Sequence, residues 1–172
     1  MRIFLIILTV LLLCSCSSTL QDYKNTQPSF TLENFFNGEL KAWGMFQDRS
    51  GKVVRRFVVD MTGTWEGNKG VLDEWFVYDD GEKQRRTWEL ERLANGQYKG
   101  QAADVVGEAS GAIEGFAFYW EYVLQLPVDD TVYNVTLKDW MYLVDDNVVI
   151  NVSKVKKFGI DLGSVTLFIQ KQ

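Results

Sequence analysis

The residues in this sequence most suited to chemistry are three adjacent pairs of carboxylates. The pairs are Asp79-Asp80, Asp129-Asp130 and Asp145-Asp146. Two carboxylates at a suitable separation could serve as general acid and base in a hydrolase. Each pair, however, lies in a stretch typical of a β-turn, where an Asp side chain accepts hydrogen bonds from its own backbone. We therefore interpret all three pairs as turn residues.

The composition excludes several other kinds of site. The chain has no histidine, so histidine triads and histidine metal sites are ruled out. No nucleophile elbow, phosphate loop or calcium loop is present. The net charge of -5 argues against a surface that binds nucleic acid, because such binding relies on clustered Lys and Arg. The sequence predicts a protein that is not an enzyme and holds no cofactor or metal.

The elements that must position any site are short strands. Turn signals such as Asp79-Asp80-Gly81 and Asn95-Gly96 tolerate positive φ angles, so the connections are tight hairpins and the sheet is antiparallel. We expect an all-β fold, an up-and-down meander of about ten strands that closes into a barrel or packs as two sheets. A helical turn in residues 32–38 could close one end. The candidate strands are residues 39–47, 52–61, 71–78, 84–93, 97–102, 105–113, 116–126, 131–138, 140–144, 148–154 and 164–170.

One predicted strand carries an unusually bulky face. Its alternate positions are Phe116, Phe118, Trp120, Tyr122, Leu124 and Leu126. We expect this face to point inward, together with Tyr133, Val135 and Leu137 on the next strand and Trp140, Tyr142 and Val144 on the one after. So much bulk indicates either a wide barrel or the lining of a cavity, and a plain aromatic core is the alternative.

A hairpin around Asp80-Gly81 brings polar groups to the inner face. With a two-residue turn, Trp75 lies opposite Arg86 and Asp73 opposite Trp88, and Val71, Val77 and Leu90 share that face. An inward guanidinium needs a carboxylate, aromatic faces or an anionic ligand beside it. Asp73 could supply the carboxylate, or the head group of a fatty acid or phospholipid could. The basic doublets Arg55-Arg56 and Lys156-Lys157 could also contact such a head group.

The N-terminus resembles the signal of a bacterial lipoprotein. Met1-Arg2 precedes an apolar run over residues 3–13, which is shorter than the roughly 20 residues of a spanning helix. Leu13-Cys14-Ser15-Cys16 follows and resembles a lipobox. We predict a signal peptide over residues 1–15, lipidation at Cys16, a lipidated tether over residues 16–29 and one domain over residues 30–172. An ordinary secretory signal with an incidental cysteine is the alternative.

The residue after the predicted lipidated cysteine indicates the membrane to which a lipoprotein is sorted. In Gram-negative envelopes an Asp at this position is the usual mark of inner-membrane retention, and this chain has Ser17. We therefore expect an outer-membrane lipoprotein that faces the periplasm and meets the membrane through the lipid on Cys16.

Sequence blocks along the chain are similar to those of one bacterial family. They include Phe35-Phe36-Asn37-Gly38, Asp48-Arg49-Ser50-Gly51 and Asp139-Trp140-Met141-Tyr142-Leu143. Over residues 30–172 the sequence resembles a lipoprotein family described as a domain of unknown function, DUF3833. The resemblance implies an envelope lipoprotein with a lipocalin-like barrel, and it identifies no ligand.

Two hypotheses for the function follow. In the first, the barrel is a carrier that binds a fatty acid or lipid and does not catalyse a reaction. Its predicted ligand-binding residues are Asp73, Trp75, Arg86, Trp88, Phe118, Trp120, Tyr122 and Trp140. In the second, the interior is filled and the protein docks to a protein partner in the envelope. Phe76, Tyr78 and Tyr119 would then be exposed on the outer surface.

Overall fold

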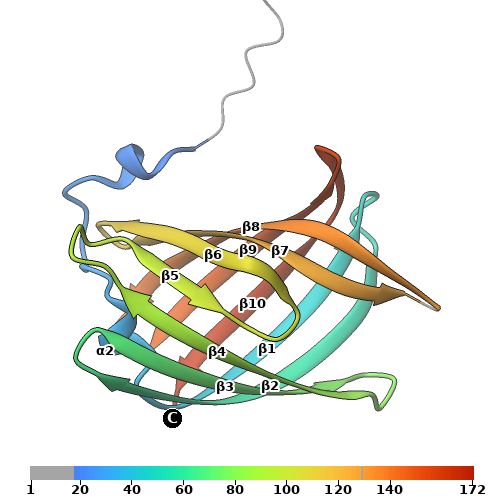
Figure 1. Ribbon diagram of the computed structural model, residues 1–172, viewed down its shortest axis with the longest axis horizontal. Helices are drawn as coiled ribbons and strands as arrows, with labels where there is room; N and C mark the ends of the chain where they lie inside the picture. The colour runs from blue at the N-terminus through green and yellow to red at the C-terminus, as the bar shows by residue number, and fades with distance from the viewer. Residues whose placement is uncertain (1–17, 129) are drawn as a thin grey trace, which may run out of the picture.

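The computed structural model describes residues 18–128 and 130–172, which form a closed antiparallel barrel (Figure 1). Consecutive strands are neighbours, and β1 closes the ring by pairing with β10. The strands are β1 (Gly38–Asp48), β2 (Val53–Glu66), β3 (Lys69–Tyr78), β4 (Lys83–Arg92), β5 (Tyr98–Gln101), β6 (Val105–Glu114), β7 (Ala117–Val128), β8 (Thr131–Asp145), β9 (Val148–Lys157) and β10 (Ile160–Lys171). The all-β, up-and-down barrel that the sequence predicts is confirmed.

The N-terminal predictions concern residues that the structure does not cover. The predicted signal peptide and the lipidation site Cys16 lie outside the described residues, as does Asp129. The domain boundaries at residues 15 and 29 therefore stay predictions. Within the described ranges, none of the helices is long and apolar enough to cross a membrane.

The carboxylates in the turns bind their own backbone, as the sequence predicts. Asp80 accepts a hydrogen bond from the Glu82 N–H at 2.9 Å, and Asp145 accepts one from the Asn147 N–H at 2.8 Å. Gly81 has a φ of 87°, which the turn requires and which other residues rarely adopt. Asp80 and Asp145 are therefore turn residues, as we interpreted them.

Two predicted strands are in fact one. Residues 131–138 and 140–144 both belong to β8, which continues through Asp139. No glycine or proline interrupts this stretch, and Asp139 pairs with Trp120 on β7 and Ser153 on β9. Because side chains alternate along an unbroken strand, Leu137 and Asp139 face inward and Trp140 and Tyr142 face outward.

The prediction that Trp140, Tyr142 and Val144 face inward is thus wrong. Val144 is 56% exposed. Trp140 and Tyr142 pack instead against Tyr23, which belongs to a short 3-10 helix, η2 (Leu20–Tyr23), on the outside of the barrel. Their aromatic surface contacts the N-terminal segment and does not line the interior.

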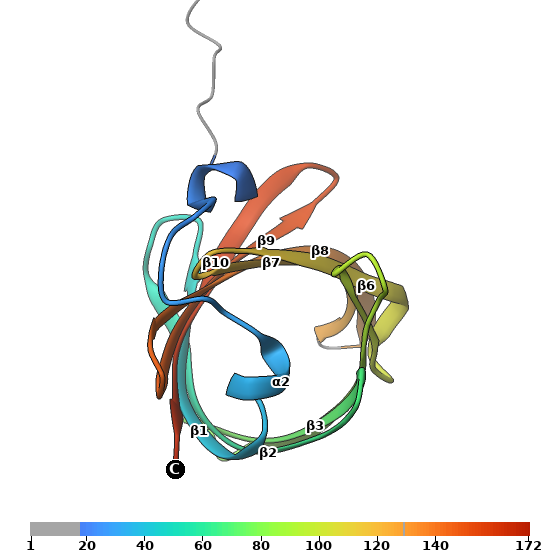
Figure 2. The same ribbon diagram turned by 90° about the vertical axis from the view of Figure 1, so that its left-hand side faces the viewer.

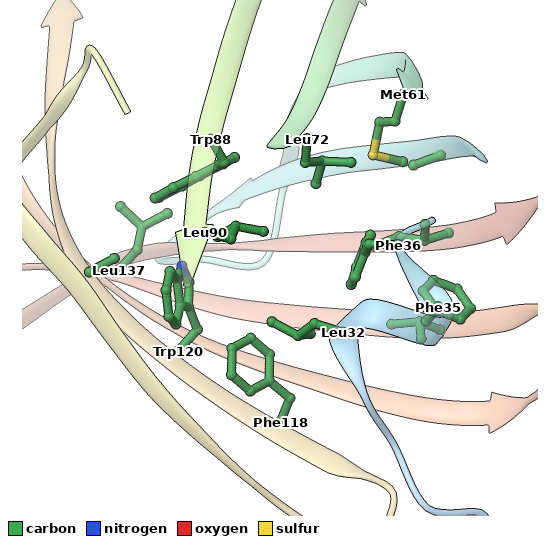
Figure 3. Packing of buried hydrophobic residues seen from close by; sticks show 14 of the residues in the cluster. Leu32, Phe35, Phe36, Met61, Leu72, Trp88, Leu90, Phe118, Trp120 and Leu137 are labelled. Atoms are coloured by element: carbon green, nitrogen blue, oxygen red, sulfur yellow. The ribbon is translucent and has the colours of Figure 1, made fainter. Parts of the chain in front are cut away.

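One end of the barrel is plugged. The short helix α2 (Leu32–Phe35) lies in the opening of the ring (Figure 2), and this confirms the expected helical turn. Figure 3 shows Leu32 and Phe36 among wall residues that include Leu90 and Trp120. The Trp65 indole N–H donates to the Phe36 carbonyl at 3.1 Å.

The plug lies very close to the backbone of β2. A Cβ built on Gly63 of β2 would lie 2.0 Å from the Phe36 carbonyl oxygen, so only glycine leaves room for the end of α2. On the other side of the ring, the Tyr98 hydroxyl donates to the Glu33 carboxylate at 2.7 Å. The plug is therefore held by hydrogen bonds as well as by apolar packing.

Candidate functional site

A cavity of about 510 Å³ lies inside the barrel. It extends from Leu32 and Phe36 of the plug to Glu82 and Val128, beside the hairpins at the opposite end. Its volume falls within the range of roughly 300–1,000 Å³ that is usual for small-molecule pockets. The filled interior that the docking hypothesis assumes is therefore not observed.

One face of β7 belongs to the apolar wall of the cavity, together with residues of β2, β3, β4, β8 and β10. Phe118, Trp120, Tyr122 and Leu124 are buried and line the cavity, as the alternation on this strand predicts. The Trp88 ring packs edge-on against Tyr122 and Trp120, with ring centroids 5.2 and 5.9 Å apart. The structure thus brings together four of the predicted site residues, Trp88, Phe118, Trp120 and Tyr122. Their role in binding a ligand stays a prediction.

The predicted register of the β3–β4 hairpin is wrong by one residue. Leu72 lies opposite Trp88, Glu74 opposite Arg86 and Trp75 opposite Arg85. The cause is the turn: the Tyr78 N–H donates to the Glu82 carbonyl, so Asp79, Asp80 and Gly81 form a three-residue loop. The sequence prediction rests on a two-residue loop.

This slip exchanges the two faces of β3. Asp73 and Trp75 face outward, and Trp75 is 40% exposed. Asp73 pairs with Arg85 at 2.9 Å rather than with Arg86.

The other face of β3 points into the barrel. Phe76 and Tyr78, which we predict outside, line the cavity, whereas Val71 and Val77 are exposed. Leu90, which we predict on the same face as Arg86, does line the cavity. Tyr119 on β7 lies on the outside of the barrel, as predicted, and packs against Trp140.

Arg86 does face the cavity, but its partners differ from the predicted one. Its Nε donates to Asp104 Oδ1 and Oδ2 at 3.1 and 2.9 Å, and its Nη2 donates to Oδ2 at 2.8 Å. Nη1 lies 3.8 Å from Glu74 Oε2. Asp104 thus accepts a bidentate bond from one edge of the guanidinium, whereas Nη1 faces Glu74 at more than hydrogen-bond distance. The sequence does not predict either partner, because Asp104 comes from a distant loop and a two-residue turn puts Glu74 on the outer face of β3.

The Arg86–Asp104 pair lies at a gap in the strand pairing. β5 pairs with residues 89–92 of β4, and β4 extends beyond the end of β5 (Figure 1). Among the described residues, the ladder on this side of β4 stops at Glu89. Asp104 follows β5 in the loop that leads to β6, and from there it reaches Arg86 across the gap.

Two further carboxylates face the cavity. Burial raises the pKa of Glu74 to about 7, although the positive charge of Arg86 opposes the rise. Burial also raises the pKa of Asp139 to about 6, against the lowering effect of Ser153 and Tyr122. Oε2 of Glu74 and Oδ1 of Asp139 are buried and accept no hydrogen bond from the described residues. Asp139 escaped prediction because it was assigned to a break between strands.

Of the basic doublets, only Arg55 reaches the cavity. Its guanidinium lies 3.5 Å above the Tyr78 ring and bonds to Asp80 and Glu82 near the open end. Arg56 pairs with Asp79 and Lys156 with Asp161. Lys157 lies 3.8 Å from the ring centroid of Tyr133.

Comparison with known proteins places the chain in a family. Residues 10–171 match the family described as "Protein of unknown function (DUF3833)". The chain belongs to this family. Membership extends over almost the whole DUF3833 chain and therefore includes every strand of the barrel. No curated protein matches the sequence.

A solved structure shares the fold of this DUF3833 protein. It is the S-type phycobiliprotein lyase CPES from Guillardia theta, with a TM-score of 0.57 and 7% sequence identity, and the match covers 79% of this chain and 88% of that one. At such low identity the likeness shows the fold alone, and it supports a lipocalin-like barrel. Because that protein is called a lyase, the comparison gives no support to the expectation that the DUF3833 protein lacks catalytic activity.

Proposed function

We propose that this protein is a lipid-anchored carrier that holds a hydrophobic small molecule, of the fatty-acid or lipid class, inside its barrel. The observation that carries the proposal is the cavity of about 510 Å³ between the plug and the open hairpin end. Trp88, Trp120, Tyr122 and Leu124 give it a wall that favours apolar groups over water.

The cavity wall favours a long apolar body. Each methylene moved from water into such a wall contributes about 0.8 kcal/mol. An alkyl chain therefore gains affinity with every carbon until the cavity is full. A rigid apolar ring system of the same volume would gain in the same way.

Retention of the ligand without reaction is the second part of the proposal. The chain lacks histidine, and the charged groups that line the cavity are Arg55, Arg86 and carboxylates. Arg86 and Asp104 bond to each other, which leaves neither free to attack a substrate. A carrier role is supported by this chemistry, and the recovered ligand should have the same structure as the molecule supplied.

The anchor and the location belong to the same proposal. Leu13-Cys14-Ser15-Cys16 supports lipidation at Cys16, and Ser17 supports sorting to the outer membrane, facing the periplasm. The described chain begins beside the plugged end, where Phe30 bonds to the Gly115 carbonyl. Metabolic labelling with a radioactive fatty acid should therefore mark the wild-type protein and leave Cys16→Ser unlabelled.

Binding in the cavity is tested with a blocked barrel and a matched control. Residues 17–172 contain all ten strands and α2, and therefore the complete closed ring. Leu124 faces the cavity and the neighbouring Val123 faces outward on the same strand. Leu124→Trp should reduce binding of the fluorescent probe N-phenyl-1-naphthylamine about ten-fold or more, whereas Val123→Trp should bind it like the wild type. Equal binding by both folded variants would contradict the proposal.

A further inference from the structure

Among residues 18–128 and 130–172, two acceptors inside the apolar cavity receive no hydrogen bond. Glu74 Oε2 and Asp139 Oδ1 are both buried, and the Asp139 residue is only 4% exposed. Buried polar atoms in native proteins are nearly always hydrogen-bonded, because an unpaired one loses its contacts with water and gains nothing in return. A bound molecule with a donor would satisfy both of these oxygens.

The two carboxylates face each other across the lumen. Glu74 is on β3 and Asp139 is on β8, which are five steps apart in the ring of ten strands. Tyr122 on β7 lies close enough to both carboxylates and to Arg86 for its pKa to respond to all three charges. The charge of Asp139 also acts on Glu74, so both carboxylates border the region of the lumen beside Tyr122 where a head group would lie.

The charges at this place do not suit an anionic head group. The ionised groups that face the lumen here are Arg86 against Asp104, Glu74 and Asp139. Arg86 donates from Nε and Nη2 to Asp104, and Glu74 lies 3.8 Å from its Nη1, so two protein carboxylates already oppose its charge. A second buried anion would add repulsion without gaining a partner.

We propose that the ligand carries an amine or hydroxyl head group, which donates hydrogen bonds to Glu74 and Asp139, and that a ligand carboxylate is rejected. This inference rests on the proposed function, since it assumes that the cavity binds a hydrophobic molecule. Within the fatty-acid or lipid class, it selects lipids whose head group donates hydrogen bonds and excludes ionised fatty acids.

The ionisation of the two carboxylates agrees with this geometry. Burial raises both pKa values, and the charge of Arg86 opposes the rise only in part. A bound ammonium or hydroxyl group would stabilise the charged forms and lower both pKa values. Above neutral pH both carboxylates are ionised, so discrimination against an anionic ligand is greatest there.

The test is a competition among three ligands that differ only in the head group. N-phenyl-1-naphthylamine is bound to residues 17–172 at about pH 8, where Glu74 and Asp139 are ionised. Dodecylamine, dodecanol and dodecanoate are then added below their aggregation limits. We expect dodecylamine and dodecanol to displace the probe at concentrations about ten-fold lower than dodecanoate.

The outcomes separate the two claims. If dodecylamine competes better than dodecanol, the positive charge of the head group contributes in addition to its hydrogen-bond donors. If the two compete equally, a hydrogen-bond donor alone is sufficient. Either result supports the inference. If dodecanoate competes as well as the other two, the inference is wrong while the proposed carrier function stands. If the wild type binds no probe at all, the proposed function fails and the inference fails with it.

Variants locate the effect. Glu74→Gln and Asp139→Asn should each reduce the preference for dodecylamine over dodecanoate to about three-fold or less. Glu89→Gln, an exposed acidic residue on the outer face of β4, should keep the wild-type preference. An unchanged preference in both cavity variants would overturn the assignment to these residues. The order of the three competitors on the wild type remains a test even if a variant does not fold.

Discussion

Arg86 and Asp104 join two parts of the barrel wall that strand pairing leaves apart. The contact between Arg86 Nη2 and Asp104 Oδ2 measures 2.8 Å, and it spans the gap between β4 and the loop that follows β5. The side chains are 15% and 24% exposed, so the pair is largely removed from water. The contact both closes the wall and neutralises the guanidinium beside an apolar cavity.

Removal of Asp104 should therefore destabilise the barrel. Asp104→Ala leaves Arg86 with Glu74 alone, at 3.8 Å, and loss of one partner of a buried pair costs about 3 kcal/mol. Asp73→Ala, which breaks the pair with the exposed Arg85 and a hydrogen bond from Thr87, should cost less, about 1 kcal/mol. Urea unfolding measures both free energies, and similar losses in the two variants would contradict the role of Arg86 and Asp104.

The stability of the protein should fall as the pH rises from about 5 to 8. The folded pKa of Glu74, about 7, lies above its ordinary value of 4.5, and that of Asp139, about 6, lies above 3.8. The folded state therefore holds these protons more tightly than the unfolded state, and the stabilisation is lost as each carboxylate ionises. Glu74 alone contributes on the order of 2 kcal/mol over this range.

A single substitution isolates this effect. Glu74→Gln should flatten the dependence of the unfolding free energy on pH between about 5 and 8, and exposed Glu89→Gln should leave it unchanged. The lowered pKa values of Asp48, Asp73, Asp79 and Asp161 act in a separate, more acidic range. A wild-type stability that rises over this range would show that Glu74 and Asp139 are not buried as described.

The plug at the closed end should depend on Gly63. A methyl group at this position would collide with the Phe36 carbonyl, so Gly63→Ala must displace α2 or β2. Overpacking of this kind costs about 1–3 kcal/mol. Thr62→Ala, at the adjacent exposed position, should change the unfolding free energy by about 0.5 kcal/mol or less. A thermal melt of both variants checks this, and equal melting temperatures would argue against a tight fit of the plug.

The tryptophans that lie inside and outside the barrel should respond differently to a ligand. Trp88→Phe should weaken probe binding several-fold, because Trp88 lines the cavity beside Tyr122. Trp140→Phe should leave it unchanged, because Trp140 packs against Tyr23 on the outside. Fluorescence titration of N-phenyl-1-naphthylamine compares the two. Weaker binding in Trp140→Phe than in Trp88→Phe would reverse the assignment of the two faces.

Much of the fold could be predicted because its signals are local. Gly81 and Gly96 mark hairpin turns, and the alternation of large and small side chains on β7 correctly places Phe118, Trp120 and Tyr122 inside. The expected end-closing helical turn also forms, since Leu32, Phe35 and Phe36 supply the apolar surface of the plug. These features depend on neighbours within a few residues.

The polar part of the site could not be predicted because it depends on register and on distant contacts. Asp79-Asp80-Gly81 is compatible with a two-residue or a three-residue loop, and the difference moves Glu74 from outside to inside. The contact between Arg86 and Asp104 requires the loop after β5 to return to β4, which no local pattern indicates. Asp139 resembles a strand break, and only the continuous ladder of β8 shows that it is buried.

The central claim is that the barrel holds a hydrophobic molecule in the cell envelope. The most direct measurement is native mass spectrometry of residues 17–172, purified without detergent from the periplasm of a bacterial host, with Leu124→Trp purified in parallel. The account predicts one molecule of an apolar compound with a donor head group per wild-type chain, and none in the blocked variant. A folded wild-type protein that carries nothing, and takes up nothing from an envelope lipid extract, would contradict it.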